Sequence, residues 1–304
     1  YGLLRFSARE SPGWAIVAKH LTTGRNLRVS GSDPNRTPLF RPERAADGEL
    51  KLNWEWAQVA VGDSGASLQV RVTGRIPARG GLTVWRIEVD NPGQDIAVKE
   101  VEFPVIGNIG KKRGATASDY FGIPFKSGML MQDPSGGGGL DDKNDGVYGN
   151  LNMQVLPYWF EGSGLYLGTF DPDGYHKRYG IKTVDGQVVE YRAYHPAPNP
   201  ETSARKFTLP FDCLIGVFEG DWYDAAKIYR QWAIRQKWCP QRPLATNEDV
   251  PRWFKENHLT MRPRGPSDVV AAEVELAART FGQPLLVNWY GWTQQKDIEE
   301  NWPD

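Results

Sequence analysis

Hydrophobic and polar residues alternate along most of the chain up to about residue 217. Such alternation, interrupted by clusters of Gly, Pro, Asn and Asp, is typical of antiparallel strands with one buried face. It is clearest in five segments: 52–56, 68–72, 85–89, 165–170 and 207–217. The third segment ends at Asn91-Pro92-Gly93, which is turn chemistry. The pattern predicts a mainly β fold with a large, twisted, antiparallel β-sandwich.

The period of the hydrophobic positions changes from two to about 3.6 at Gly220. Asp221 is a natural N-cap and Pro240 stops the periodic segment, so a helix is predicted over residues 220–238. One face of this helix carries most of its apolar side chains: Trp222, Ala225, Ala226, Tyr229, Trp232 and Ala233. We expect the three aromatic residues of this face to pack against the sandwich.

After Pro251 the pattern becomes strand, helix, strand. Residues 257–262 are a strand candidate, Ser267 is expected to cap a helix that ends at Gly282, and residues 285–287 are an apolar strand. One such unit buries too little apolar surface to be a domain, so it is expected to begin a parallel sheet or a truncated (β/α)8 barrel. The predicted domains are as follows: a sandwich over 1–219, a linking helix and connection over 220–251, and the start of the barrel over 252–304.

The composition narrows the range of partners. Lys and Arg number 36 and Asp and Glu 37, so no global field would attract a nucleic-acid backbone. No apolar run approaches the roughly 18 residues of a membrane span, so membrane insertion is not expected. Trp, Tyr and Phe occur twelve times each, and aromatic faces fill cores or bind sugar rings. Cys213 and Cys239 are expected to be buried thiols, with a bridge between them as the alternative.

Residues 220–233 read GDWYDAAKIYRQWA, and Gln236, Trp238, Val250-Pro251, Trp253 and Asn288-Trp289-Tyr290-Gly291-Trp292 follow. With these motifs the chain resembles a poorly characterised family of bacterial glycoside-hydrolase-like proteins. That family is related in layout to endo-α-N-acetylgalactosaminidases and α-galactosidases, and the resemblance covers most of Gln154 to Trp292. It implies an N-terminal β-supersandwich, a linking helix and a catalytic (β/α)8 barrel.

The resemblance also implies a function. The parent protein is expected to be a glycoside hydrolase that acts on α-linked galactose-type or related sugars with two carboxylates. In the family these carboxylates lie on later barrel strands, so the catalytic pair is expected beyond Asp304 and the fragment is expected to be inactive alone. An oligosaccharide or polysaccharide substrate, the rest of its own barrel as partner, and an extracellular or periplasmic location are implied as well; a cofactor or metal is not.

Two other functions stay open: a non-catalytic carbohydrate-binding sandwich, and a structural sandwich that docks on another domain. Under the enzyme hypothesis, substrate is expected beyond the carboxyl ends of parallel strands. Asn288, Trp289, Tyr290 and Trp292 follow such a strand and are the predicted substrate-binding residues. The alternative is that Trp289 and Trp292 pack in the barrel wall and that Asn288 caps a loop.

Three other features are assigned structural roles. His258 is expected to be a core or interface histidine. The acidic run at 141–146 lacks the ligand pattern of an EF-hand and is expected to be a solvated loop. The segment from Asp171 to Gly174 reads as a hairpin turn, supplemented by an ion pair between Asp171 and Lys177 that contributes little if it is exposed.

Overall fold

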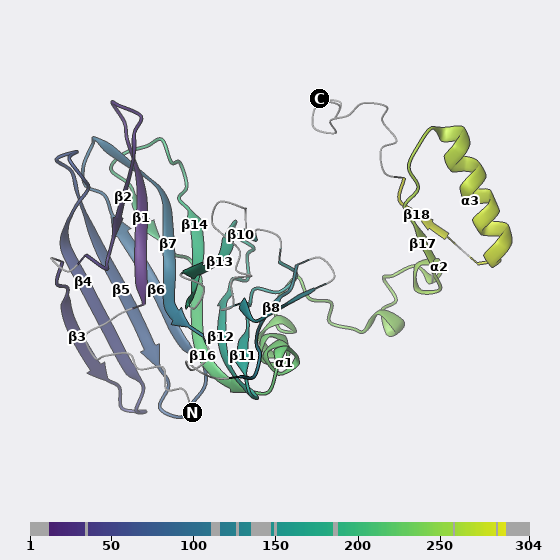
Figure 1. The fold of residues 1–304 in the computed structure, drawn as a ribbon, viewed down its shortest axis with the longest axis horizontal. Coiled ribbons are helices and arrows are strands. Elements are labelled where there is room, and N and C mark those ends of the chain that lie inside the picture. Colours follow the sequence, from purple (N-terminus) through teal and green to yellow (C-terminus); the bar gives the residue numbers. More distant parts are fainter. Residues whose placement is uncertain are drawn as a thin grey trace. The chain divides into compact units, whose positions relative to one another are not determined.

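Figure 1 shows a computed structural model, which describes residues 12–33, 36–110, 116–125, 128–134, 147–148, 151–184, 188–257, 259–283 and 285–289. The chain divides into two compact units, Tyr1–Lys237 and Trp238–Asp304. The predicted domain limits at residues 219 and 251 remain a prediction. No helix among the described residues is long and apolar enough to cross a membrane.

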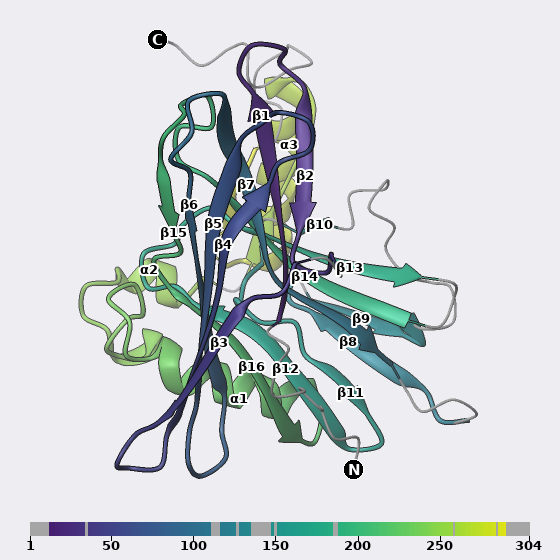
Figure 2. The same ribbon diagram turned by 90° about the vertical axis from the view of Figure 1, so that its left-hand side faces the viewer.

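The first unit contains two antiparallel sheets (Figures 1 and 2). The six-stranded sheet has the order β10-β13-β14-β7-β1-β2, and its strands are β1 (Gly13–His20), β2 (Asn26–Ser30), β7 (Ile96–Ile109), β10 (Val147–Tyr148), β13 (Arg178–Val184) and β14 (Val188–Pro196). The ten-stranded sheet has the order β3-β4-β5-β6-β16-β12-β11-β8-β9, with β15 paired to β6. Its strands are β3 (Leu39–Arg44), β4 (Leu50–Ala60), β5 (Ser67–Ile76), β6 (Thr83–Asp90), β8 (Asp119–Ile123), β9 (Met129–Gln132), β11 (Tyr158–Phe160), β12 (Ser163–Phe170), β15 (Lys206–Thr208) and β16 (Asp212–Glu219).

The predicted mainly β fold is confirmed, and the alternation in the sequence marks the inner faces of the strands. The main core gathers the apolar residues of both sheets, and aromatic rings fill much of it. The rings of Trp14 and Trp56 meet edge to face with centroids 5.2 Å apart, and those of Trp54 and Trp85 lie 5.9 Å apart. Because burying one large apolar side chain stabilises a fold by about 1.5 to 3 kcal/mol, this aromatic layer holds the two sheets together.

Helix α1 (Trp222–Ala233) covers the other face of the ten-stranded sheet, through a second cluster of buried residues. Asp221 and Asp224 form the expected capping box at its start. Tyr229 is buried, and Trp232 stacks on Phe170 with a centroid distance of 4.7 Å and an interplanar angle of 1°. The prediction for Trp222 is wrong: its side chain is 51% exposed, because it lies at the first helical position, at the edge of the covered area.

The turn after Asp171 is a corner between the two sheets rather than a hairpin, since β12 and β13 belong to different sheets. Asp171 is fully buried, its Oδ1 accepts the N–H groups of Asp173 and Gly174 at 3.0 Å, and its Oδ2 lies 2.5 Å from Nζ of Lys177. The predicted ion pair therefore forms, but it is buried and not exposed. Burial lowers the pKa of Lys177, and the Asp171 carboxylate opposes that shift.

His195, on β14, lies beside this corner and is 3% exposed. Its Nε2 is 2.6 Å from the carbonyl oxygen of Phe103, whereas Nδ1 has no hydrogen-bond partner among the described residues. The ring meets Phe211 edge to face, and the ammonium of Lys177 lies 4.7 Å from the centroid of the same Phe211 ring. Burial lowers the pKa of His195 to about 4, to which the charge of Lys177 adds. The imidazole is therefore neutral in the folded protein at neutral pH.

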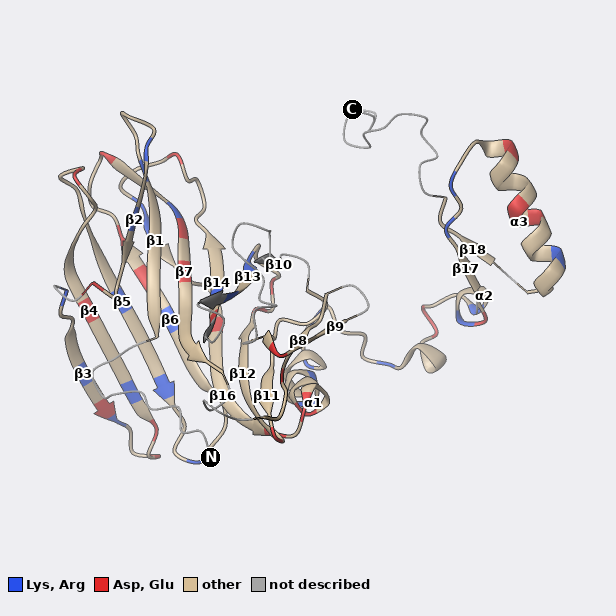
Figure 3. Ribbon diagram, viewed as in Figure 1, with Lys and Arg blue, Asp and Glu red and all other residues tan. Residues whose placement is uncertain are grey.

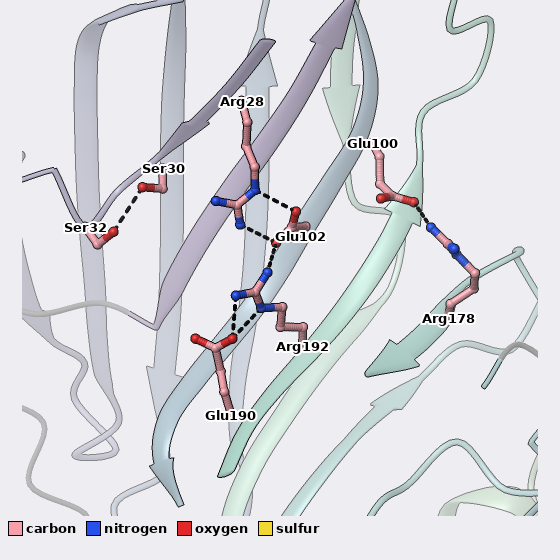
Figure 4. A network of polar contacts seen from close by, with 8 residues as sticks. All are labelled: Arg28, Ser30, Ser32, Glu100, Glu102, Arg178, Glu190 and Arg192. Carbon is pink, nitrogen blue, oxygen red and sulfur yellow. Dashed lines mark hydrogen bonds and ion pairs between the residues drawn. The ribbon is translucent and has the colours of Figure 1, made fainter. Parts of the chain in front are cut away.

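The outer face of the six-stranded sheet carries a network of ion pairs (Figure 4). Glu102 accepts from Nε and Nη2 of Arg28 at 3.1 and 2.7 Å and from Nη1 of Arg192 at 3.0 Å. Arg192 also donates to Glu190 at 2.5 Å. Burial lowers the pKa of Arg192, but the Glu190 and Glu102 carboxylates outweigh burial and raise it. Cation and carboxylate alternate across β2, β7 and β14, so each buried charge is compensated.

The second unit contains a parallel pair of strands, β17 (Leu259–Met261) and β18 (Leu285–Val287), joined by α3 (Ser267–Phe281). The predicted strand–helix–strand order is confirmed, and Gly282 ends α3 in the left-handed conformation, with φ of 58°. Ser267 does not cap this helix, because it is the first helical residue and follows Pro266. The short 3-10 helix η3 (Leu244–Thr246) and helix α2 (Arg252–Lys255) were not predicted. Both cysteines are free, and Cys239 is only partly buried.

The buried corner leads to a prediction about stability. Asp171→Ala should lower the free energy of unfolding by about 3 to 5 kcal/mol, because it leaves the Lys177 ammonium buried without its carboxylate. Asp173→Ala is the matched control, since it removes only an exposed pair with Lys237 and should cost at most about 1 kcal/mol. Denaturant unfolding of both variants measures the difference. Equal losses for the two would contradict the role of the buried pair.

His195 leads to a prediction about pH. The unfolded chain binds a proton at the ordinary histidine pKa of 6.5 and the folded chain at about 4, so stability is fully present above pH 6.5 and falls as the pH drops towards 4. The loss should reach about 3 kcal/mol below pH 4. In His195→Gln this component should be missing from the pH profile of the unfolding free energy. Parallel profiles for wild type and variant would show that the histidine does not titrate as described.

Candidate functional site

The carboxyl ends of β17 and β18 lie at the same edge of their sheet, because the two strands are parallel. Leu259, Thr260 and Met261 stand opposite Leu285, Leu286 and Val287. The N–H of Asn288 donates to the carbonyl of Met261 at 2.9 Å, so the pairing continues one residue beyond β18. The residues that follow each strand are therefore neighbours, at the edge where parallel sheets commonly bind ligands.

Trp289 packs in this edge. Its side chain is partly buried, and its indole N–H donates to the carbonyl of Gly265 at 3.2 Å. Gly265 lies in the connection between β17 and α3 and has φ of 126°, a conformation that side chains disfavour. The contact therefore ties the end of β18 to the segment after β17. This geometry favours the packing role of Trp289 over direct binding of substrate.

Asn288 is exposed, and its side chain makes no hydrogen bond to any residue that the structure describes. Its amide can both donate and accept, which suits a sugar hydroxyl. Tyr290 and Trp292, the other two predicted binding residues, lie outside the described residues, as do His258 and the acidic run at 141–146. The structure thus places Asn288 and Trp289 at the edge of the sheet, whereas a binding role for Tyr290 and Trp292 remains a prediction.

The segment that follows β17 was not predicted to be part of the site. Residues 262–266 carry two cations, Arg262 and Arg264, at the edge that also holds Asn288. The parallel arrangement was the available signal, since it places the ends of both strands side by side. Within residues 262–266 and 288–289 there is no carboxylate, so this part of the edge can bind a ligand but cannot supply the acid and base of glycoside hydrolysis.

A second feature was missed because Trp222 was assigned to packing. Trp222 and Ala226 line an apolar hollow of about 450 Å³ in the first unit, together with the β8–β9 hairpin and residues 152–157. Met129 and Leu130 of the hairpin are 44% and 58% exposed. Among the described residues, no group of three or more His, Cys, Asp or Glu side chains could hold a metal ion. The residues that line the hollow are largely apolar, so it offers apolar contact to a ligand.

Comparison with known proteins agrees with this architecture. Residues 207–304 match the model of a domain of unknown function, DUF6259. A Bacteroides thetaiotaomicron protein named "Putative glycoside hydrolase" is 23% identical over 277 residues, which are 86% of this chain and 38% of that protein. The predicted resemblance to a glycoside-hydrolase-like family is confirmed.

Two structures of α-N-acetylgalactosaminidase NagBb from Bifidobacterium bifidum share the fold. The GalNAc complex matches 92% of this chain and 51% of that chain with a TM-score of 0.58, and the Gal-NHAc-DNJ complex matches 96% and 52% with a TM-score of 0.59. The identity is 13% in both. The chain thus spans about half the length of the matched enzyme and about two fifths of the length of the curated relative.

The contact of Trp289 can be tested directly. Trp289→Phe keeps an aromatic ring but leaves the Gly265 carbonyl without its donor, a loss of about 0.5 to 1.5 kcal/mol. Hydrogen exchange of the amides in β17 and β18 should accelerate by about two- to tenfold. Asn288→Ala changes an exposed side chain and should leave exchange nearly unchanged. Equal acceleration in both variants would contradict the packing role of Trp289.

Proposed function

We propose that this chain is the N-terminal part of a glycoside hydrolase that acts on α-linked galactose-type or related sugars. In this proposal residues 252–304 begin a (β/α)8 barrel, and the rest of that barrel is the partner of the chain. The catalytic pair of carboxylates lies beyond Asp304. The observation that carries the proposal is similarity along 86% of the chain to one glycoside-hydrolase-like protein, joined to a fold shared with an α-N-acetylgalactosaminidase.

Two carboxylates suffice for this chemistry. One protonates the leaving oxygen of the glycosidic bond, and the other attacks the sugar or activates a water. The residues of this chain would bind and orient the sugar beside that pair. Asn288, exposed at the end of β18, would hydrogen-bond a hydroxyl, and Tyr290 and Trp292 would contact the apolar face of the ring. Trp289 would hold the edge in place through Gly265.

The whole protein that carries this chain provides the test. Aryl α-galactoside and aryl α-N-acetylgalactosaminide are the first substrates, because the matched structure bears the name of the second activity. Tyr290→Ala and Trp292→Ala should lower kcat/KM by tenfold or more, about 1.4 kcal/mol or more of transition-state binding, while the melting temperature stays near that of wild type. Asp173→Ala, in the sandwich, is the control for a distant surface change.

The reverse result would assign these residues to packing. Deleting a buried Trp commonly costs about 3 to 5 kcal/mol, so a large loss of thermal stability with unchanged kcat/KM would remove Tyr290 and Trp292 from the site. A whole protein that binds either glycoside but cleaves neither would instead favour a carbohydrate-binding sandwich without catalysis.

A further inference from the structure

The outer face of the ten-stranded sheet carries a polar hollow of about 290 Å³ over β3, β4, β5 and β6. Bands of charged residues cross these strands in Figure 3. The apolar residues of the same strands belong to the core, so the charged residues lie on the opposite face, towards solvent. Six polar side chains line the hollow: Glu43, Lys51, Asn53, Thr73, Arg75 and Arg86.

The strand register places like charges together in this hollow. Lys51 on β4 stands directly opposite Arg75 on β5. Arg86 on β6 stands opposite Thr73, which is two residues from Arg75 on the same face. Like charges directly opposite each other in a sheet are destabilising. Three cations therefore converge on neighbouring strands, at a cost that a bound anion would offset.

The protein compensates this charge only in part. Asp212 lies 2.6 Å from Arg86 and 3.9 Å from Arg75, so one carboxylate serves both arginines. Lys51 forms no ion pair with any described residue, although Glu43 stands opposite it in the register. Lys51, Arg75 and Arg86 are all exposed, so a ligand can reach them.

Between the cations lie two neutral groups, Asn53 and Thr73, which are opposite each other and half-buried. In the part of the chain that the structure describes, their side chains make no hydrogen bond. An amide and a hydroxyl suit sugar hydroxyls, and the planar fork of an arginine suits a carboxylate. We propose that this hollow binds a saccharide that carries carboxylates, such as an oligomer of uronic acid.

The choice of a saccharide rests on the proposed function, whereas the choice of an anion rests on the charges of the hollow. Among the described residues that line it, none carries an aromatic side chain, so ring stacking does not contribute and charge supplies the selectivity. Binding should therefore weaken as salt increases, because exposed charges are screened over about 8 Å at physiological ionic strength.

The whole protein is titrated in 50 and 300 mM salt with trigalacturonic acid, and with β-1,4-linked galactotriose as a neutral counterpart that the proposed activity on α-linked sugars would not take as a substrate. The acidic trisaccharide should bind, more weakly at the higher salt, and the neutral one should bind at least about tenfold more weakly. Lys51→Gln and Arg75→Gln should each raise the Kd of the acidic trisaccharide by about tenfold.

Arg71→Gln is the matched control. Arg71 lies on the same face of β5 but outside the hollow, between Glu55 at 3.8 Å and Glu88 at 3.7 Å, so its loss should change the Kd less than twofold. Lys51→Gln should not lower the melting temperature, because it removes a like-charge pair. This readout separates a binding defect from a folding defect.

Equal affinity of wild type, Lys51→Gln and Arg75→Gln for trigalacturonic acid, or no binding at all, would overturn the proposal. Cleavage of the aryl glycosides, measured on the same samples, distinguishes this failure from failure of the proposed function. A protein that cleaves them but does not bind the acid lacks the second site only. A protein that binds the acid through Lys51 and Arg75 but cleaves neither glycoside retains the site and loses the proposed activity.

Discussion

The two sheets of the first unit pack against each other through their inner faces. This contact determines which side chains of the strands are buried and which remain accessible to a ligand. The rings of Trp14, Trp54, Trp56 and Trp85 occupy the space between the sheets, so aromatic residues on these strands are unavailable for binding sugars. The outward-facing side chains of β4, β5 and β6 are largely charged or polar. The same contact requires the chain to pass from one sheet to the other, and at one of these passages it buries charge as well.

The connection between β12 and β13, which joins the two sheets, is where this charge is buried. The corner from Asp171 to Lys177 is exposed at residues 173–176 but buries the side chains at both of its ends, and some of its backbone N–H groups find an acceptor in the protein. A carboxylate that accepts two of them and also holds an ammonium satisfies the corner with one side chain. His195 can remain next to it only as the neutral imidazole. The acid sensitivity predicted for the protein thus follows from the burial of His195, to which the charge of Lys177 at this corner adds.

The periodicity of the sequence predicted the strands and the capped helix. It did not predict features that depend on contacts between residues far apart in the chain. Alternation revealed the strands, and the Gly220–Trp222 segment revealed a capped helix, because both signals lie within a few residues. Sheet membership is not encoded in that period, so the corner at Asp171 looked like a hairpin. Trp222 matched the buried face by spacing but lies where the covered area ends. At the candidate site, the order of strands predicted Asn288 and Trp289, whereas the bond to Gly265 depends on a loop that spacing does not specify.

The outer faces of the two sheets differ in how completely their charges are paired. On the six-stranded sheet, Arg28, Glu102, Arg192 and Glu190 alternate in sign, and Glu102 is almost fully covered by its partners (Figure 4). Such a network is complete without a ligand. On the ten-stranded sheet, Lys51 and Arg75 repeat the same sign across neighbouring strands. Asp212 on β16 compensates the two arginines of the hollow only in part, and Lys51 forms no ion pair with any described residue. A bound anion would offset the charge that remains, which is the physical reason to expect one there.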